Sequence, residues 1–487
     1  MIDRNLYTGL VRLMKRLRPG VMILLSTAAL SAVSMDARAQ SGGPAAGARV
    51  FTLEEALQHA VDHYPTVRAA LEQTNASAAH VTVARSASLP RLDALWQTNR
   101  ATANNIFGQV LPQSAIPAMS GPVLTSASAG SVWGSAAGAL LSWEPFDLGL
   151  RSATVREAEA LVGRARADEA LTRLDVQSAV AGAFLAVVTA QQAVSAADAD
   201  VQRRDVLARA ARTLADNQLR PGAEASRAEA ERAAAYTRAI QARQILALTQ
   251  ATLGRVLGVT TGLVTTDAAR LLDRAPTEAP LGPAVHAHPL AQVRQAAVDI
   301  ARAREDVLAR TDRPRLYLQS SAFARGSGAN PDGHLDGGVG GLGLERGNWA
   351  TGVQVVFPNL FDFTSLRARQ AASAALTRAE SARHEEALLT VTSQQQSANI
   401  LLDAARAIAL NTPIQLAAAQ QSEAQARARY EAGLASIVEV AETQGLLAQA
   451  EYQNAVARVD VWRGLLARAV AYGNVPSFIG LVRAGAP

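Results

Sequence analysis

The most extended hydrophobic pattern in the chain is helical and runs without proline from about Ser152 to Asp216. Within it, apolar or small side chains recur at alternating steps of three and four residues, as in a heptad repeat. These residues are Leu171, Leu174, Ser178, Ala181, Leu185 and Val188. A single helix over this stretch would be about 95 Å long. We predict a long, closely packed helix here, and a second one from about Leu366 to Tyr430 that is interrupted at Pro413.

Between the helical runs, the pattern changes to the alternation of a β-strand. In NWATGVQVVF, every second residue is apolar or Thr: Trp349, Thr351, Val353, Val355 and Phe357. Weaker versions occur in LDALWQTNRA and LYLQSSAFARG, and SAGSVWGSAAGALLSW is similarly rich in Trp, Val, Ser and Gly. We expect two strands within residues 92–145 and two within 315–358. The loop of the first pair contains three prolines, Pro112, Pro117 and Pro122, and the loop of the second is rich in glycine.

The same order of elements occurs twice in the chain. A shift of 224 residues places Pro65 in DHYPTVRAALEQ on Pro289 in HAHPLAQVRQAA and, without a gap, places Pro90 on Pro314, each in the sequence PRL. Further on, PFDLGLR and LFDFTSLR are related by a shift of 216 residues, and each opens a long helical run. Each half therefore reads as a helix, two strands and a pair of long helices.

The first helix carries a clear start signal. In TLEEALQHA, Thr52 can cap the helix while Glu55, three residues later, reaches back in a capping box. Pro65 predicts a kink or a break soon afterwards.

The N-terminus has the order of a secretory signal peptide. Four basic residues, Arg12, Lys15, Arg16 and Arg18, precede the apolar stretch VMILLSTAALSAVS, which ends near the small-residue pattern ARA. A membrane anchor is the alternative, but the stretch is short for a spanning helix. We divide the chain into a signal peptide (1–39), a linker (40–50), a first repeat (51–282, with the helix pair 152–258), a second repeat (283–473, with the helix pair 366–473) and a C-terminal tail (474–487).

Composition and charge narrow the possible functions. Aromatic residues make up only 4% of the 487 residues, and Cys is absent, which excludes disulfides, thiolate metal sites and a catalytic Cys. Outside residues 1–39 the chain has 41 Lys and Arg against 40 Asp and Glu, so its charge gives no reason to expect a nucleic-acid partner.

Two motifs that can indicate a ligand site have weaker support than the alternative that these residues are only structural. Gly338 to Gly343 match a dinucleotide fingerprint, but they lie in a glycine-rich loop without the helix that such a site needs. His59 and His63 have metal-ligand spacing but no third ligand. No GxSxG, SxxK or carboxylate constellation organises a catalytic site. We therefore predict a protein that is not an enzyme and has no catalytic residue, metal site or cofactor.

The motifs and their order resemble those of the TolC-like outer-membrane efflux proteins. The resemblance rests on TLEEAL, the two PRL sites, PFD…LR, LFDF…LR and above all RYEAGLASIVEVAETQ, and it covers about Phe51 to Gly473. It implies a mainly α fold with a membrane β part, in which four strands from each protomer of a homotrimer close one transmembrane β-barrel. The long helices would continue as a coiled-coil tunnel across the periplasm. The expected junctions of helix and barrel are Pro90, Pro145, Pro314 and Pro358.

The resemblance also implies two kinds of site in the helical part. Gly433 can end one helix of a hairpin, and Glu439 and Glu442 follow on one face of the next helix. These acids match the family's constriction at the periplasmic mouth, where three copies would gather six carboxylates; two solvated surface glutamates are the alternative. Family members can hold a basic residue near this turn, whereas Leu434 and Ala435 stand here.

The hairpin tip of the first half has its own candidate residues. At the shift of 216 residues, Asn217 corresponds to Gly433, and Arg220, Pro221 and Gly222 mark a turn between helices. Asn217, Arg220, Gly222 and Gly433 are the expected docking positions for an adaptor protein; simple turns are the alternative.

The function that follows from the resemblance is a passive exit duct in the outer membrane of a Gram-negative bacterium, extending into the periplasm. Its expected partners are outer-membrane lipid, a periplasmic adaptor and an inner-membrane pump, and its expected cargo is small toxic compounds or drugs. Two alternatives stay open: a duct for type I polypeptide secretion, and a periplasmic coiled-coil structural protein without a channel.

Overall fold

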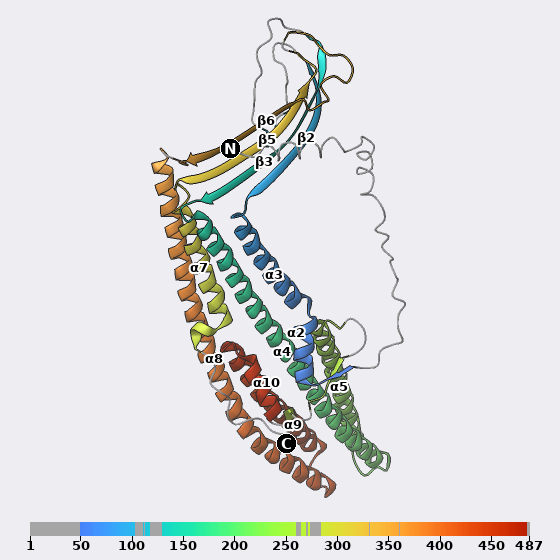
Figure 1. The fold of residues 1–487 in the computed structure, drawn as a ribbon. Coiled ribbons are helices and arrows are strands. Elements are labelled where there is room, and N and C mark those ends of the chain that lie inside the picture. Colours follow the sequence, from blue (N-terminus) through green and yellow to red (C-terminus); the bar gives the residue numbers. More distant parts are fainter. Residues whose placement is uncertain are drawn as a thin grey trace. The chain divides into compact units, whose positions relative to one another are not determined.

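The computed structural model describes residues 49–102, 111, 113–116, 129–259, 264–268, 271–272, 284–330, 332–359 and 361–484 (Figure 1). All of them belong to one compact unit, Gly47–Pro487. The predicted signal peptide and the loop prolines Pro112, Pro117 and Pro122 lie outside the described residues.

Long helices form most of the described chain. In order, they are α2 (Leu53–His63), α3 (Pro65–Ser86), α4 (Leu150–Asp216), α5 (Gly222–Leu257), α7 (Pro289–Leu308), α8 (Phe363–Glu431), α9 (Ile437–Ala471) and α10 (Val475–Ala484), with a 3-10 helix η1 (Val285–Ala287) before α7. The predicted long helices are confirmed, since α4 has 67 residues and α8 has 69. The heptad positions Leu174, Ala181, Leu185 and Val188 are buried.

The predicted interruption of the second long helix at Pro413 is wrong. α8 continues through this residue, although a proline in a helix interior removes one backbone hydrogen bond and costs about 3 kcal/mol. The reason is that α8 packs along α9 on both sides of the proline, through Leu402 before it and Ala426 after it, both of which are buried. Packing over the whole length of the helix outweighs the local penalty.

The local signals near the N-terminus are confirmed. The Oγ1 atom of Thr52 accepts from the Glu55 N–H at 3.3 Å, and a Glu55 carboxylate oxygen accepts from the Thr52 N–H at 3.0 Å, which completes the capping box. The chain breaks at Tyr64, which has an extended backbone, and α3 starts with Pro65 at its first position, where proline is tolerated.

Four antiparallel strands form one sheet in the order β2, β3, β5, β6. Their bounds are β2 (Arg91–Thr102), β3 (Ser131–Phe146), β5 (Arg315–Ser327) and β6 (Arg346–Val356). The two strand pairs of the two halves join where β3 pairs with β5, for example at Ala139 and Ala322. β2 and β6 are the outer strands of this curved sheet (Figure 1), and each pairs with one other strand among the described residues. A second sheet, of the short parallel strands β1 (Arg49–Phe51) and β4 (Val264–Thr266), was not predicted.

The main hydrophobic core, which we call the central core, joins α2, α4, α5, α9 and α10. Its largest buried side chains include Phe184, Trp462 and Phe478. The indole N–H of Trp462 donates to the Leu271 carbonyl at 2.7 Å, and its ring meets Phe478 edge to face. Residues 475–484, expected to belong to a tail, therefore form a helix that completes this core. α4 includes one stretch long and apolar enough to cross a membrane, but Phe184 and its neighbours there are packed in the core.

A smaller cluster, which we call the tip core, lies near the far ends of the long helices. Its buried members are Ala208, Ala211, Ala228, Ala426, Tyr430, Ile437 and Val440. It lies next to two connections, which we call the first tip (217–221, between α4 and α5) and the second tip (432–436, between α8 and α9).

Candidate functional site

The four-stranded sheet has one apolar and one polar face. Paired residues of neighbouring strands share a face, so the register assembles an apolar face from all four strands: Leu92, Trp96, Leu141, Trp143, Leu316, Leu318, Trp349, Val353 and Val355. The opposite face carries Arg91, Asp93, Gln97, Asn99, Ser142, Gln319, Ser321, Arg325, Asn348 and Gln354. Apolar residues on the polar face, such as Leu95 and Phe323, are covered by Ile116.

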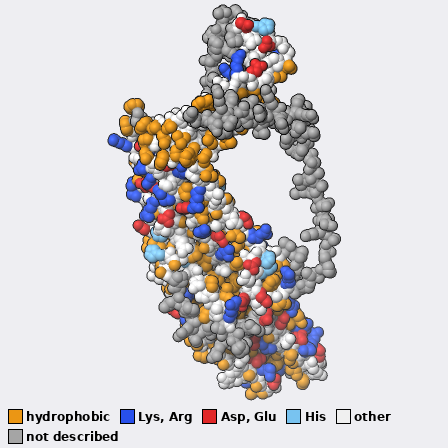
Figure 2. Space-filling model, viewed as in Figure 1, with side chains coloured by type: hydrophobic (Ala, Val, Ile, Leu, Met, Phe, Trp, Pro, Cys, Tyr) orange, Lys and Arg blue, Asp and Glu red, His pale blue; other side chains and the backbone are white. Residues whose placement is uncertain are grey.

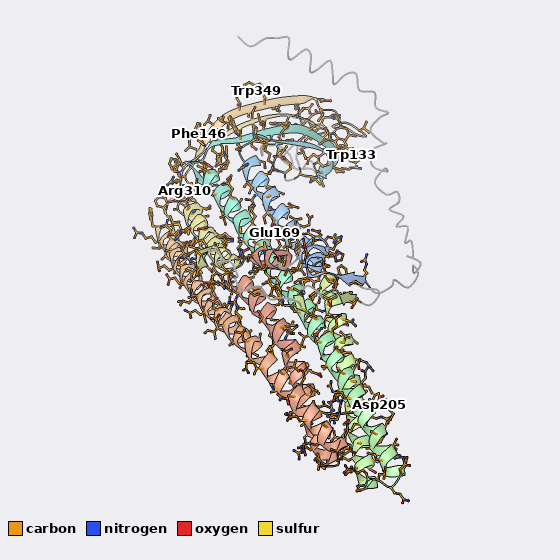
Figure 3. The ribbon with its side chains drawn as sticks, turned by 90° about the horizontal axis from the view of Figure 1, so that it is seen from below. Trp133, Phe146, Glu169, Asp205, Arg310 and Trp349 are labelled. Carbon is orange, nitrogen blue, oxygen red and sulfur yellow. The ribbon has the colours of Figure 1, made fainter. Side chains whose placement is uncertain are left out.

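The apolar face is exposed. Trp96 is 61% and Trp349 is 76% exposed, and Phe146, at the end of β3, is also exposed (Figure 3). Hydrophobic side chains gather over the sheet and the adjoining helix ends (Figure 2). Soluble monomers rarely expose a contiguous patch of this kind, which marks a surface for membrane or protein. A sheet with an apolar side and a polar side fits the wall of a membrane barrel.

The four prolines expected at the ends of the sheet lie in three different settings. Pro90 and Pro314 immediately precede β2 and β5, and Pro358 follows β6. Pro145 lies inside β3, where the pairing with β5 is irregular between Trp143 and Phe146. A proline has no N–H for the ladder, so an irregular position is where a strand tolerates it.

The PFD…LR motif anchors β3 to α4. The two carboxylate oxygens of Asp147 accept from the N–H groups of Gly149 at 3.0 Å and Arg151 at 2.5 Å, which caps the start of the helix. The Arg151 guanidinium donates back to the Glu144 carbonyl at 2.6 Å. The indole N–H of Trp143 donates to the Ser88 carbonyl, two residues after the end of α3, at 2.9 Å. Strand and helix are thus held together by side chains of the motif itself.

The second tip closes as predicted at Gly433. This residue has φ +78°, in the left-handed region that favours glycine. The Leu434 N–H donates to the Arg429 carbonyl at 2.8 Å and the Gly433 N–H donates to the Tyr430 carbonyl at 3.0 Å, which is the Schellman pattern of a helix end.

The first tip closes in the same way, but its left-handed residue is Gln218, with φ +58°, and not Asn217. The Leu219 N–H donates to the Leu214 carbonyl and the Gln218 N–H to the Ala215 carbonyl. The correspondence of Asn217 with Gly433 is therefore wrong by one residue. Sequence could not show this, because Gln carries no signal for a conformation that costs a non-glycine residue about 1 kcal/mol or more. Gly222 is the first residue of α5.

Arg220 connects the first tip to the end of α8. Its guanidinium lies 5.1 Å from the ring centre of Tyr430 and donates to the Tyr430 carbonyl at 3.4 Å. It also faces the Glu224 carboxylate at 3.8 Å, which accepts from the Tyr430 hydroxyl at 3.4 Å. Burial, followed by the negative charge of Glu224, raises the pKa of Tyr430, so the hydroxyl stays a donor. One arginine of the first tip thus holds an aromatic ring at the end of α8, just before the second tip.

The two acidic candidates differ in their surroundings. Glu439 faces Arg429 across the second tip, with 3.5 Å between Oε1 and Nη1. The turn positions Leu434 and Ala435 are not basic, and Arg429 is the basic residue that pairs with Glu439 instead. Glu442 is exposed and forms no ion pair with any described residue. Of the two carboxylates, only Glu442 is thus wholly available for interactions outside the described chain.

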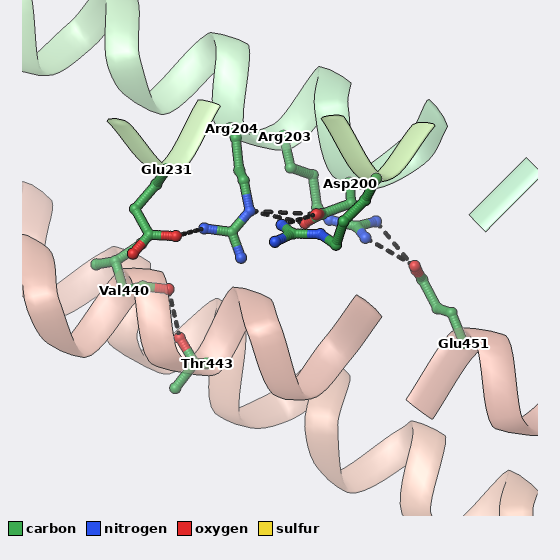
Figure 4. Close-up of polar contacts among 8 residues, drawn as sticks. Asp200, Arg203, Arg204, Glu231, Val440, Thr443 and Glu451 are labelled. Atoms are coloured by element: carbon green, nitrogen blue, oxygen red, sulfur yellow. Dashed lines mark hydrogen bonds and ion pairs between the residues drawn. The ribbon is translucent and has the colours of Figure 1, made fainter. Parts of the chain in front are cut away.

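A buried network of charges joins the long helices between the central core and the tips (Figure 4). Asp200 and Arg204, both under 5% exposed, pair within α4 at 3.0 Å. Arg204 also binds Glu231 of α5 at 2.9 Å, and Arg238 of α5 binds Asp200 at 3.0 Å.

A further ion pair connects α4 to α9. Both terminal nitrogens of Arg203 contact the carboxylate of Glu451, at 3.0 and 2.7 Å, in a bidentate pair (Figure 4). Through this pair and the buried network, α4 is connected to both α5 and α9.

The sequence profile of the family described as outer membrane efflux protein matches residues 56–259 and 288–465. The chain belongs to this family. It is therefore a channel-type protein of the outer membrane that extends into the periplasm. No curated protein matches the chain in sequence.

Solved structures of outer-membrane channels have the same fold. The outer membrane protein VceC from Vibrio cholerae has 16% identity and a TM-score of 0.68, covering 87% of this chain and 96% of VceC. The CmeC outer membrane channel of Campylobacter jejuni has 16% identity and a TM-score of 0.70, covering 86% and 85%. The open state of the MtrE outer membrane channel of Neisseria gonorrhoeae has 17% identity and a TM-score of 0.67, covering 87% and 89%. At these identities the likeness shows the fold.

Sequence reasoning did not find the polar contacts that join distant parts of this outer membrane efflux protein. Asp200 and Arg204 carry a local signal, because they lie four residues apart on one helix. Their partners Glu231 and Arg238 lie on another helix and give no such signal. The rings of His59 and His63 stack at 4.5 Å, and the described residues contain no cluster of three groups that could hold a metal.

Proposed function

We propose that this protein is the outer-membrane exit duct of a tripartite efflux system. Three copies would each contribute four strands to one closed barrel, and the long helices would form the tunnel that leads to it. The observation that carries the proposal is the two-faced sheet, whose outer strands β2 and β6 each pair with one described strand only. In hydrocarbon each backbone polar group needs a partner, so such a sheet can span a membrane only when further strands close it.

Exposed apolar side chains on the helices support the assembly. On α5 they are Tyr236, Ile240, Ile245 and Leu248, and on α8 they are Leu389, Ile400, Leu401, Ile408 and Ile414. Helices of neighbouring copies would bury these residues, as they bury the apolar stripe of any helix in a bundle. A periplasmic structural protein without a channel gives no reason for the exposed tryptophans of the sheet, so the structure favours the duct.

The two tips would dock the periplasmic adaptor, and an inner-membrane pump would supply the free energy for export of small toxic compounds. Leu219 and Leu434, at the first and second tip, are 69% and 72% exposed and offer apolar contacts there. Asn217, Arg220, Gly222 and Gly433 would be the docking positions beside these leucines. The duct itself would need no cofactor.

Glu439 and Glu442 would form the gate at the periplasmic mouth. Three copies would bring six carboxylates together, and the repulsion between like charges would favour bound cations. In the conformation described here Glu439 is paired with Arg429, so the free charge of the ring would come first from Glu442.

The test is conductance of the purified protein in a planar bilayer. We expect a heat-sensitive trimer, extracted only with detergent, that conducts weakly, prefers cations and is blocked by polyvalent cations from the periplasmic side. The variant Glu439→Gln/Glu442→Gln should lose the block and much of the selectivity. Glu386→Gln, which removes an exposed acid of α8 that forms no ion pair with a described residue, is the matched control. A water-soluble monomer would contradict the duct, and wild-type block in the double variant would contradict the gate alone.

A further inference from the structure

Among the described residues between β2 and β3, one short segment lies against the polar face of the sheet. It consists of residues 113–116, which we call the inner segment. Its Ile116 packs on Ala136 of β3 and Phe323 of β5, with Leu95 of β2 beside them. Ile116, Ala136 and Phe323 are each at most 6% exposed. A side chain from the connection between two strands is thus as deeply buried as a core residue.

The contact lies well inside the sheet and not at its end. Ala136 lies five residues after the start of β3 at Ser131, and Phe323 lies four residues before the end of β5 at Ser327. These strand ends are the ones that face away from the helices. At about 3.3 Å per residue, Ile116 therefore meets the sheet about 13 to 17 Å inward from that edge. A connection that only joined β2 to β3 would not need to reach this far.

The inner segment is closed by its own hydrogen bonds. The Gln113 Oε1 atom accepts from the Ile116 N–H at 2.7 Å, and Gln113 Nε2 donates to the Ile116 carbonyl at 2.8 Å. One side chain therefore satisfies both backbone groups of Ile116, as burial outside regular secondary structure requires. The turn places Ile116 on the sheet without leaving its backbone unpaired.

The sheet has an apolar patch where Ile116 meets it. Gly138 pairs with both Leu95 and Phe323, so these three residues form one row on the polar face, and Ala136 is the next residue of β3 on that face. A Cβ atom at Gly138 would lie 2.5 Å from the Cβ atom of Phe323, so a larger residue does not fit without a shift. The interior face of a membrane barrel is normally polar and meets no lipid. Ile116 therefore gives this patch its apolar partner.

We infer that the inner segment narrows the channel inside the barrel, and that the contact of Ile116 with Phe323 holds it there. The inference rests on the proposed duct, in which the polar face lines the lumen and the apolar face meets lipid. Three copies would bring three inner segments into one lumen. Apolar constrictions resist the passage of hydrated ions by dewetting. The barrel would thus carry a second constriction, apolar in character, in addition to the acidic gate of Glu439 and Glu442.

The first test measures whether the inner segment is held on the sheet, and it uses the absence of Cys from the chain. Ala115→Cys places a single thiol at a buried position, and Leu111→Cys places one at an exposed position. In the full chain in detergent, fluorescein maleimide should label Ala115→Cys at least about tenfold more slowly, because only local opening exposes that thiol. Adding Ile116→Ala or Phe323→Ala should remove most of this difference. Fast labelling of Ala115→Cys alone would overturn the inference.

The second test measures whether the segment narrows the passage. In planar bilayers, Ile116→Ala and Phe323→Ala should each raise the single-channel conductance. Val353→Ala, which shortens an exposed side chain on the apolar face, is the matched control and should change neither conductance nor labelling. Heat stability of the assembled protein checks that each variant is folded.

The outcomes separate the constriction from the duct itself. Fast labelling of the Phe323→Ala protein with unchanged conductance would show that the inner segment packs on the sheet without narrowing the channel. To limit the resistance of the periplasmic gate, the conductances are also compared in the Glu439→Gln/Glu442→Gln background. A wild-type protein that forms no channel would instead contradict the proposed duct.

Discussion

The central core and the tip core stabilise the same long helices by different means. The central core buries large side chains such as Trp462, Phe184 and Phe478, and the indole of Trp462 makes one hydrogen bond within the described chain. The tip core buries mainly alanines around Tyr430, and charged groups such as Asp200 and Arg204 lie beside it. Apolar burial stabilises in proportion to area, whereas buried ion pairs lose to desolvation most of what they gain. We therefore expect the central core to supply most of the stability and the charges near the tips to define how the helices are placed.

Removing the indole from the central core should have the largest effect. Trp462→Ala should destabilise the protein by about 3 to 5 kcal/mol, because it creates a cavity among fully buried residues. Trp462→Phe should cost about 1 to 3 kcal/mol, since it leaves the Leu271 carbonyl without its donor. Thermal unfolding in detergent, followed by circular dichroism, measures both. Tyr430→Phe in the tip core is the control, and an equal loss there would contradict the comparison.

Breaking the buried charge network should come next. Asp200→Ala should cost about 3 kcal/mol, because it removes one of two acidic partners from the buried Arg204. Asp198→Ala, which breaks the exposed pair with Arg243, should cost less than about 1 kcal/mol.

The double variant Asp200→Leu/Arg204→Leu sharpens the point. We expect the buried charges to fix the positions of the long helices while contributing little to the free energy of unfolding. In that case this variant should regain most of the melting temperature lost in Asp200→Ala. A double variant as unstable as the single one would show that the charges themselves stabilise the helices near the tips.

The two tips should respond to glycine in opposite ways. Gln218→Gly should stabilise by about 1 kcal/mol, since it relieves a left-handed non-glycine residue, whereas Gly433→Ala should destabilise by a similar amount. Melting temperatures in detergent show the direction of both changes.

Gly433→Val, with a β-branched side chain, should lower the melting temperature more than Gly433→Ala does. It should also weaken export while the barrel stays assembled. Normal export by Gly433→Val at a normal protein level would argue against the second tip as a docking surface.

The smallest expected effect is the pH dependence that His288, at the start of α7, should cause. His288 caps α7: its Nδ1 accepts from the Leu290 N–H at 3.1 Å, so its Nε2 carries the proton and donates to the Val470 carbonyl at 3.1 Å. Burial lowers the pKa of His288, although the Val470 carbonyl and Asp175 oppose the shift. The unfolded chain then binds more protons, so stability should fall as the pH drops below about 6.5.

His288→Asn, which keeps a capping side chain, tests this expectation. The variant should show a flatter loss of melting temperature between pH 7.5 and about pH 5.5, the interval around the ordinary histidine pKa. An unchanged pH profile would show that His288 does not control it.

The sequence predicted those features whose cause is local. The alternation around Trp349, the capping box of Thr52 and the left-handed turn at Gly433 each depend on a few neighbouring residues, and each is confirmed. The predicted interruption at Pro413 was wrong because the energetic penalty of a proline in a helix is local, whereas the packing that overcomes it extends along α8.

Features that depend on distant partners could not be predicted. The pair of Arg429 and Glu439 spans a turn, the contact of Arg220 with Tyr430 joins the two halves, and the polar face of the sheet depends on the register between strands. Among the candidate residues, the position of Gly433 and the alternation of the sheet were thus predictable, whereas the base beside Glu439 was not.

The outer strands β2 and β6, each of which pairs with one described strand only, also bear on how the protein reaches its membrane. Before insertion, each newly exported chain would carry two free strand edges and a row of exposed tryptophans through the aqueous periplasm. Such edges pair readily with any other strand, including those of a second copy in the wrong register. We therefore expect biogenesis to require a holding chaperone until strand pairing between copies and insertion occur together. Chains with a disrupted sheet register should accumulate as periplasmic aggregates even when their helices fold normally.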